Sequence, residues 1–319
     1  MSWPENTAFS PTLPTLQLYW DSVSTGALKK CPRYYQLANV EGWTRKGTEG
    51  RVDLDFGIWL HSGRERYYHA RADGKTHEEG VDAALQYVLT ATWNPETQRP
   101  WQGDQYKNRL SLARTLVDYL DKYEFDPLVT VIKFDKKPAV EVTFKFPLGW
   151  NPEHSATEEF WLCGHLDRVV DFQGKTYISD LKSTRHDLGD RYWKQFLLSN
   201  QFNIYTVAGN LVLKSKVSGL IVDACQVLVT EPARFSRRII EKTEAQLSEF
   251  MRAMRTLLHQ AESYARNNFW PQNENACFQY GRPCEFLEIC GRAPSVREQW
   301  LKADFTKRVW DPLIARGDI

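Results

Sequence analysis

Residues 164–184 read GHLDRVVDFQGKTYISDLKST and decide how the centre of this chain folds. Two strand-like runs flank a two-residue break, Gln173-Gly174. A break of this kind predicts a tight β-hairpin in which Phe172 pairs with Lys175. A bulge or a three-residue loop would shift the register by one residue and turn every side chain to the other face.

Charged residues interrupt this hairpin where apolar ones are expected. Counting outward from the turn places Asp167 directly opposite Asp180, with Cβ atoms about 4.5–5.5 Å apart. Lys182 lies two residues beyond Asp180 and therefore on the same face. Two like charges destabilise a sheet, so the pair invites a cation, and carboxylate oxygens suit Mg²⁺ or Mn²⁺. The alternative is a solvated polar face, which antiparallel sheets often carry.

The composition excludes several classes of protein. The chain has 319 residues, 42% of them hydrophobic, and a formal net charge of +1. A charge this small gives no global attraction to nucleic acid or membrane, so any basic surface is local. No apolar run approaches the length of a transmembrane helix, and the N-terminus does not resemble a secretion signal. We therefore expect a cytoplasmic protein with reduced thiols and no membrane partner.

The hydrophobic period changes along the chain. Helical patterns are expected from Ser24 to about Leu37, from Asp55, and over 76–93 and 106–123. Strands follow at 129–134, 139–146, 157–172, 175–184, 219–230 and 234–242, with one long helix over 191–212 between them. An Asp-Lys-Lys-Pro turn joins the first two strands, and Thr243 with Gln246 forms a capping box that opens a last helix. This order predicts an α/β or α+β fold with a mixed sheet.

Four cysteines have an uneven distribution. Cys277, Cys284 and Cys290 are bunched in a Pro- and Gly-broken segment, and Cys31 stands far away. The two remaining cysteines, Cys163 and Cys225, lie in apolar runs typical of a core.

The hairpin's Gly-x-x-Asp and Asp-x-Lys motifs resemble those of the PD-(D/E)xK nuclease superfamily, in particular its RecB-type branch. The resemblance implies a restriction-endonuclease-like αβββαβ core with a mixed central sheet, a helical N-terminal elaboration and an iron–sulfur cap. It implies catalytic roles for Asp167, Asp180 and Lys182. It also implies a Mg²⁺ or Mn²⁺ site made of His61, Asp167, Asp180 and the Leu181 carbonyl.

Further motifs match the same branch in order. Gln201 and Tyr205 resemble its Gln-x-x-x-Tyr motif, which lines the DNA channel and would contact bases or phosphate. Ser183, Thr184 and Arg185 follow the catalytic lysine at once and are expected to contact the DNA backbone. A strand glutamate of this branch corresponds to Glu141, for which an exposed strand position is the alternative. A local phosphate track is expected from Arg234, Arg237 and Arg238, with a solvated edge strand as its alternative.

The separated cysteines resemble the split cluster of AddB-type subunits, CRISPR-associated nucleases and phage exonucleases. By this resemblance, Cys31, Cys277, Cys284 and Cys290 hold a 4Fe-4S cluster. Their C-x6-C-x5-C spacing departs from the C-x2-C-x5-C form of several relatives. Zinc and unligated thiols are the alternatives, although structural zinc sites usually contain closer cysteine pairs.

The sequence therefore predicts one nuclease domain over 1–319. Its parts are a helical region (24–125), the central sheet with the active site (129–242), a helix with the cysteine cluster (243–293) and a tail (294–319). The expected activity is metal-dependent exonucleolytic cleavage of DNA in recombination, repair or phage DNA processing, in a bacterial or phage-infected cell. The expected partners are DNA with a free or single-stranded end and a helicase or recombination protein. The competing interpretations are an inactive module that binds nucleic-acid ends and a zinc-stapled adaptor.

Overall fold

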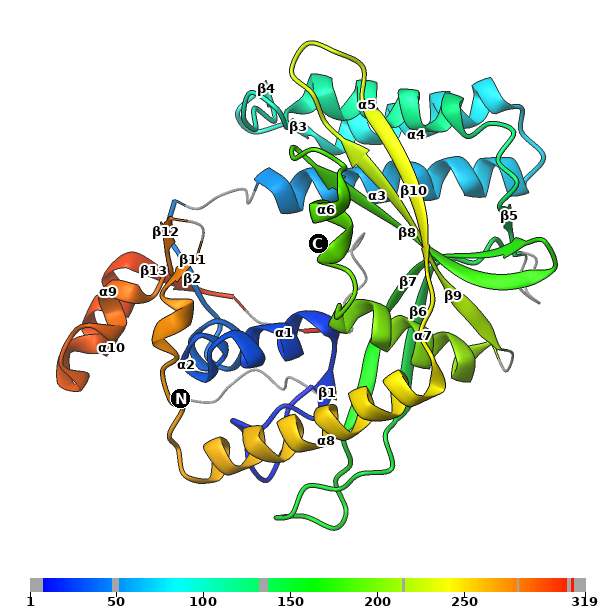
Figure 1. Cartoon of the computed structure of the whole chain (residues 1–319). Helices are drawn as coiled ribbons and strands as arrows, with labels where there is room; N and C mark the ends of the chain where they lie inside the picture. The colour runs from blue at the N-terminus through cyan, green and yellow to red at the C-terminus, as the bar shows by residue number, and fades with distance from the viewer. Residues whose placement is uncertain are drawn as a thin grey trace. The chain divides into compact units, whose positions relative to one another are not determined.

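A computed structural model describes residues 8–47, 52–131, 137–213, 216–279, 281–308 and 311–312. The chain forms two compact units (Figure 1). Among the described residues, unit 1 contains those within 8–47, 144–164 and 244–312, and unit 2 contains those within 52–143 and 165–243. The single nuclease domain expected over 1–319 stays a prediction. No helix in the described part of the chain is apolar over enough of its length to cross a membrane.

Unit 2 is built on a mixed β-sheet. Strands β7 and β8 are antiparallel, β8 and β9 are parallel, and β9 and β10 are antiparallel. The short strand β5 and the longer β6 both pair with β7, and β6 and β7 continue into unit 1. The bounds are β5 Val129–Thr130, β6 Val140–Pro147, β7 Trp161–Phe172, β8 Lys175–Thr184, β9 Val217–Gln226 and β10 Arg234–Ile240.

The central hairpin has the predicted register. Phe172 pairs with Lys175, and the ladder continues without a shift to Arg168 and Ser179. Both turn residues in Gln173-Gly174 have positive φ, at 53° and 74°. Positive φ at both central positions is typical of the type I′ turn, whose twist matches that of the two strands. The turn chemistry therefore fixes which residues meet at the far end of the hairpin.

Three helices of unit 2 pack together ahead of the sheet in sequence. They are α3 (Val52–Ala72), α4 (His77–Ala91) and α5 (Arg109–Lys122), and the short pair β3 (Trp93–Asn94) and β4 (Arg99–Pro100) lies between the last two. Gly63 allows α3 to approach its neighbours closely. A Cβ atom at this glycine would lie 2.6 Å from Leu116 Cδ2 and 2.9 Å from Val88 Cγ2.

The long helix expected over 191–212 is wrong. The chain forms α6 (Asp190–Lys194) and a separate α7 (Asn200–Val212). Ser199 has extended backbone angles, and its side chain accepts a hydrogen bond from the Phe202 N–H, so it caps a new helix. The hydrophobic pattern of 191–212 runs through residues 195–199 without a change, but these residues form a loop, and the cap at Ser199 starts a new helix.

Helix α7 supplies the crossover between the parallel strands β8 and β9. The succession α3, β6, β7, β8, α7 and β9 confirms the predicted mixed α/β fold. The expected Asp-Lys-Lys-Pro turn covers residues 135–138, and its first half, 135–136, lies outside the described residues.

Unit 1 joins the two ends of the described chain. Its short strand β1 (Tyr19–Trp20) pairs with the start of β7, and its longest helix is α8 (Glu244–Arg266). The helix expected from Ser24 to about Leu37 begins earlier and is interrupted: its N-cap is Asp21, which forms a reciprocal capping box with Ser24, and α1 ends at Lys30. The remaining elements are α1 Ser22–Lys30, α2 Pro32–Tyr35, the π-helix η1 Gln36–Val40, β2 Trp43–Arg45, the 3₁₀ turn η2 Glu274–Ala276, β11 Phe278–Gln279, β12 Arg282–Pro283, α9 Leu287–Cys290, α10 Pro294–Asp304 and β13 Phe305–Lys307.

Candidate active site and cysteine cluster

Three side chains of metal-ligand type meet in unit 2: His61 of α3, Glu141 of β6 and Asp167 of β7. Their ligand atoms all lie within 4.8 Å of one another. His61 Nδ1 is 3.1 Å from Asp167 Oδ2 and 3.6 Å from Glu141 Oε1. One imidazole and two carboxylates are a donor set that Mg²⁺ and especially Mn²⁺ accept. The residues therefore fit a divalent cation.

The Leu181 carbonyl orients His61. Its oxygen lies 2.8 Å from His61 Nε2, and because a carbonyl only accepts, that nitrogen carries a proton. In the neutral ring, Nδ1 then presents its lone pair to the two carboxylates. The Leu181 carbonyl thus fixes the ring of a histidine that could bind a metal, and its own expected contact with the metal stays a prediction.

The surroundings of His61 favour a positive charge at Nδ1. Burial alone would lower the pKa of His61, but Asp167 and Glu141 outweigh burial and raise it. A cation at this point would take the place of the proton.

Asp180 and Lys182 form a pair beside this group. Asp180 is fully buried, and Lys182 Nζ lies 2.9 Å and 2.8 Å from its two carboxylate oxygens. Burial raises the pKa of Asp180, Lys182 opposes that rise, and Asp167 adds to it. Asp180 lies outside the group formed by His61, Glu141 and Asp167, and its assignment as a metal ligand stays a prediction. Its carboxylate positions the lysine.

The two aspartates lie immediately beyond the last pair of the β7–β8 ladder, Arg168 and Ser179. Asp167 Oδ2 accepts a 3.4 Å hydrogen bond from the Leu181 N–H. The Asp167 carboxylate thus accepts the hydrogen bond of the Leu181 N–H, which has no partner residue in the β7–β8 pairing. The sheet consequently avoids holding two opposed carboxylates inside regular pairing.

Glu141 is a ligand candidate that the sequence matches to a strand glutamate of the family but does not assign to the metal site. Its backbone has a φ of 46°, which is uncommon for a residue other than glycine, Asn or Asp. Such strain persists where the surroundings fix it, and it is frequent at functional sites. A glutamate inside the apolar run 139–146 was the one signal available in the sequence.

Arg64 is a second residue that the sequence reasoning missed. It is 1% exposed and its NH2 lies 3.7 Å from Asp167 Oδ2. Burial alone would lower the pKa of Arg64, but Tyr119 and Asp167 raise it. Its spacing from His61, three positions along α3, places both on one side of the helix and was the available signal.

The predicted DNA-contacting pair is close together but differs in exposure. Gln201 Nε2 donates a 2.9 Å hydrogen bond to Tyr205 Oη. Tyr205 is only 3% exposed, so its ring has no open face for a base, and the expected contact of this residue with DNA stays a prediction. Gln201 is partly exposed, so the tyrosine holds the glutamine and only the glutamine can reach a substrate.

The predicted phosphate track is similarly divided. Arg237 pairs with Asp126 and Asp223 inside unit 2, so it serves the fold and is removed from the track. Arg234 and Arg238 remain exposed, each in a surface ion pair.

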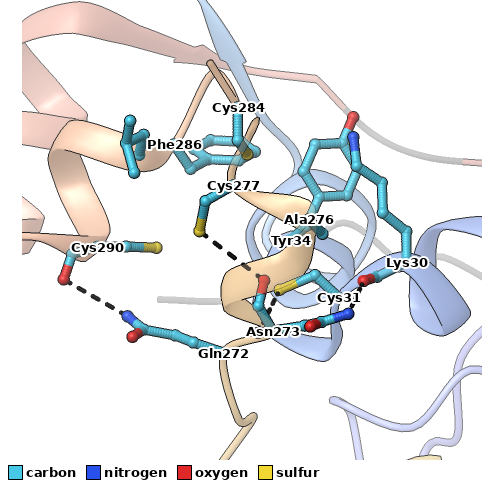
Figure 2. Close-up of a pocket in the computed structure, with 11 residues that line it drawn as sticks. Lys30, Cys31, Tyr34, Gln272, Asn273, Ala276, Cys277, Cys284, Phe286 and Cys290 are labelled. Atoms are coloured by element: carbon cyan, nitrogen blue, oxygen red, sulfur yellow. Dashed lines mark hydrogen bonds between the residues drawn. The ribbon is translucent and has the colours of Figure 1, made fainter. Parts of the chain in front are cut away.

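In unit 1, all four predicted cluster cysteines line one small cavity (Figure 2). Cys31 follows α1, and Cys277, Cys284 and Cys290 come from the segment around η2 and α9. All four are free thiols, and Cys31 Sγ accepts a 3.3 Å hydrogen bond from the Asn273 N–H. Burial raises the pKa of both Cys284 and Cys290. Four sulfur donors around one cavity fit a metal centre bound by thiolates.

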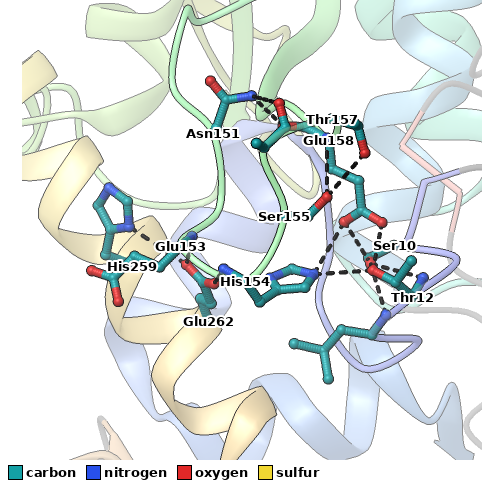
Figure 3. A network of polar contacts seen from close by, with 12 residues as sticks. Ser10, Thr12, Asn151, Glu153, His154, Ser155, Thr157, Glu158, His259 and Glu262 are labelled. Atoms are coloured by element: carbon teal, nitrogen blue, oxygen red, sulfur yellow. Dashed lines mark hydrogen bonds and ion pairs between the residues drawn. The ribbon is translucent and has the colours of Figure 1, made fainter.

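A polar network supports unit 1 elsewhere (Figure 3). His154 Nδ1 lies 2.8 Å from Glu262 Oε1 and its Nε2 lies 3.2 Å from Glu158 Oε2. Glu262 also accepts hydrogen bonds from the backbone N–H groups of Glu153 and His154. Burial alone would raise the pKa of both glutamates, but hydrogen bonds from Thr12 and Ser10, together with His154, lower that of Glu158. The backbone N–H groups and His154 lower that of Glu262. The network ties α8 to the loop before β7.

Comparison with known proteins identifies the family of the chain. The model of the PD-(D/E)XK nuclease superfamily matches residues 24–291. No sequence among curated proteins matches the chain. A crystal structure from Eubacterium rectale, named as a candidate exonuclease, is 13% identical, with a TM-score of 0.47 over 92% of this chain and 100% of that one. The structure of SSO0001 is 11% identical, with a TM-score of 0.26 over 63% and 74% of the two chains.

Proposed function

Because this chain belongs to the PD-(D/E)XK nuclease superfamily, we propose that it is a metal-dependent deoxyribonuclease that degrades DNA from an end. The observation that carries the proposal is the meeting of His61, Glu141 and Asp167 beside the Asp180–Lys182 pair. A non-catalytic binding module would have no need of a buried ligand group next to a paired lysine.

In this proposal, His61 Nδ1, Glu141 and Asp167 hold one Mg²⁺ or Mn²⁺. The bound ion supplies a Lewis acid that lowers the pKa of a water and neutralises charge on phosphate. Asp180 holds the Lys182 ammonium in place, and Lys182 orients the attacking water and stabilises charge that develops on the phosphoryl oxygens. Arg64 lies 3.7 Å from Asp167 Oδ2 and would hold that carboxylate in position.

End-labelled DNA tests this activity. Linear, nicked-circular and single-stranded substrates, labelled at either terminus, are incubated with Mg²⁺, Mn²⁺ or EDTA. We expect cleavage of linear and single-stranded DNA with either metal, and none in EDTA. Lys182→Met should lose about 10²-fold or more in rate, whereas Lys175→Met, at the other end of β8, should not. Cleavage that survives in Lys182→Met would refute the catalytic assignment.

We further propose that the four-cysteine cavity holds a 4Fe-4S cluster with a structural role. A cluster bound by Cys31 and the three later cysteines would join the start of unit 1 to its C-terminal segment. Because the cluster would bind the folded unit and hold two distant segments together, its binding free energy would stabilise that unit against unfolding.

Metal analysis of anaerobically purified protein distinguishes iron from zinc. We expect brown protein that contains iron and sulfide, and Cys284→Ala should lose the colour and melt at a lower temperature. Cys163→Ala, which removes a thiol of unit 1 outside the cavity, should keep the colour. Colourless wild-type protein with stoichiometric zinc would replace the cluster by a zinc site.

The biological setting proposed from the resemblance is recombination, repair or phage DNA processing in the cytoplasm of a bacterium or an infected cell. A helicase or recombination protein would supply the single-stranded end. Co-purification from cells with and without DNA damage tests for such a partner.

A further inference from the structure

A cluster of charges lies beside the end of the catalytic strand β8. Lys107, from the loop before α5, reaches Ser183, the residue after Lys182, with Nζ 3.1 Å from its Oγ and 3.4 Å from its carbonyl oxygen. The same Nζ is 2.9 Å from Asp53 Oδ1. Arg185 contacts both oxygens of Asp53 at 3.1 Å, so two cations converge on one carboxylate.

The two cations are held in place independently of that carboxylate. Lys107 is only 2% exposed, and its ammonium lies 5.2 Å from the centre of the Phe56 ring. A lysine this buried loses much of its freedom and its hydration, so the surrounding residues fix where its charge is presented. Arg185 also contacts Asp104 Oδ2 at 3.3 Å. The pair of cations is therefore preorganised.

Asp53, by contrast, is weakly anchored. Its side chain is 59% exposed and lies in the first turn of α3. Exposed ion pairs contribute little to stability because water solvates both charges. An oxyanion with more charge and more acceptor atoms would displace this side chain at small cost.

We propose that Lys107, Arg185 and the Ser183 hydroxyl form a binding site for a DNA phosphate next to the scissile one, and that Asp53 occupies this site until DNA displaces it. A lysine, a planar guanidinium and a hydroxyl are the donors that proteins use for phosphate, and arginine matches its oxygens in pairs. The inference rests on the proposed nuclease function and adds a substrate subsite guarded by an acidic residue.

Removal of the acidic partner of these two cations should strengthen DNA binding. Asp53→Asn should bind DNA more tightly, because the phosphate no longer competes with a carboxylate. The matched control is Asp55→Asn, which removes one charge from the same first turn of α3 without touching Lys107 or Arg185. Both variants lose the same formal charge, so a general change in attraction to DNA cancels between them.

Binding is measured by fluorescence anisotropy with a fluorescein-labelled single-stranded 20-mer in EDTA, where no cleavage occurs. We expect Asp53→Asn to lower Kd about three- to tenfold relative to Asp55→Asn, the range for one partly exposed charge. The gain should vanish in an Arg185→Gln background, since the anion then has only one cation. Melting temperatures of all variants accompany the binding data.

Equal Kd values for Asp53→Asn and Asp55→Asn, or weaker binding by Asp53→Asn, would overturn the subsite and leave an ion-pair network that only supports α3. A gain that persists with Arg185→Gln would also overturn it. If neither wild type nor Asp53→Asn binds DNA, the proposed nuclease function fails together with the subsite. If the wild type binds and cleaves DNA but Asp53→Asn has an unchanged Kd, the subsite is refuted and the proposed nuclease function stands.

Discussion

Replacing Arg64 by methionine separates a role in the site from a role in the fold. Arg64 is buried and its guanidinium lies 3.7 Å from Asp167 Oδ2. At that distance two unit charges attract by about 4 kcal/mol when the effective dielectric constant is about 20. Removing Arg64 takes a positive charge away from the buried Asp167, which keeps His61 and the Leu181 N–H beside it, and loss of one member of a buried ion pair typically costs about 3–5 kcal/mol. Methionine recovers part of the loss because it needs no hydration.

We therefore expect Arg64→Met to lose about 3 kcal/mol of unfolding free energy in EDTA, or about 6–12 °C in Tm. Saturating Mn²⁺ should reduce the deficit to less than half, because the cation restores a positive charge next to Asp167 and stabilises the folded state by mass action. Mn²⁺ should also bind more tightly to Arg64→Met than to wild type, since Arg64 repels it.

Thermal melts in EDTA and in Mn²⁺, with calorimetric titration of Mn²⁺, measure both effects. Arg64→Lys keeps the charge and should lose less stability in EDTA. Arg66→Met, at an exposed position of the same helix, should change the free energy of unfolding by no more than about 0.5 kcal/mol. Equal losses of Tm for Arg64→Met with and without Mn²⁺, and unchanged Mn²⁺ affinity, would refute the link between Arg64 and the metal site.

Three other outcomes are expected. The pKa of Glu262 is lower in the folded protein than its ordinary value of 4.5, so the unfolded chain binds more protons near that pH, and the free energy of unfolding falls as pH drops from 6 towards the folded-state pKa. Urea unfolding across that range should show a weaker dependence of this free energy on pH in Glu262→Gln. An equal dependence in the variant and the wild type would disprove the linkage. Gly63→Ala should cost about 1–3 kcal/mol by overpacking, whereas Gly57→Ala on the same helix, with nothing within 4 Å, should not destabilise; Tm values compare them directly. Gln201→Ala should weaken DNA binding severalfold while Tyr205→Phe changes it less, and the reverse order in anisotropy would contradict the exposure argument.

The sequence predicted the central hairpin because its determinants are local. A two-residue turn with positive φ sets the register, and the alternation of side chains carries that register to its far end. The same reasoning extended the pairing by one pair too many, to Asp167 and Asp180. The ladder stops at Arg168 and Ser179, and counting along an idealised ladder cannot show where pairing ends.

Tertiary contacts decided what the sequence could not. Glu141 and Arg64 joined the candidate site through the approach of β6 and α3 to Asp167, over sequence separations of 26 and 103 residues. Neither residue carries a short motif, so only the folded chain brings them together. For Tyr205 the motif is recognisable in the sequence, but its burial is not, because that depends on how α7 packs against the rest of the fold.

The charges around the candidate site explain why a sheet tolerates three carboxylates there. Glu141, Asp167 and Asp180 carry three negative charges when ionised, while Arg64 and Lys182 supply two positive ones. The remaining charge of about −1 lies next to the His61 lone pair in a buried setting, where an uncompensated charge is costly. A proton shared between His61 and the carboxylates relieves it in the metal-free protein, which agrees with the raised pKa of His61. A divalent cation relieves it further, because it also neutralises a phosphate that enters beside it. The same charges that destabilise the site in the absence of metal would thus favour the complex of metal and DNA that the proposed reaction requires.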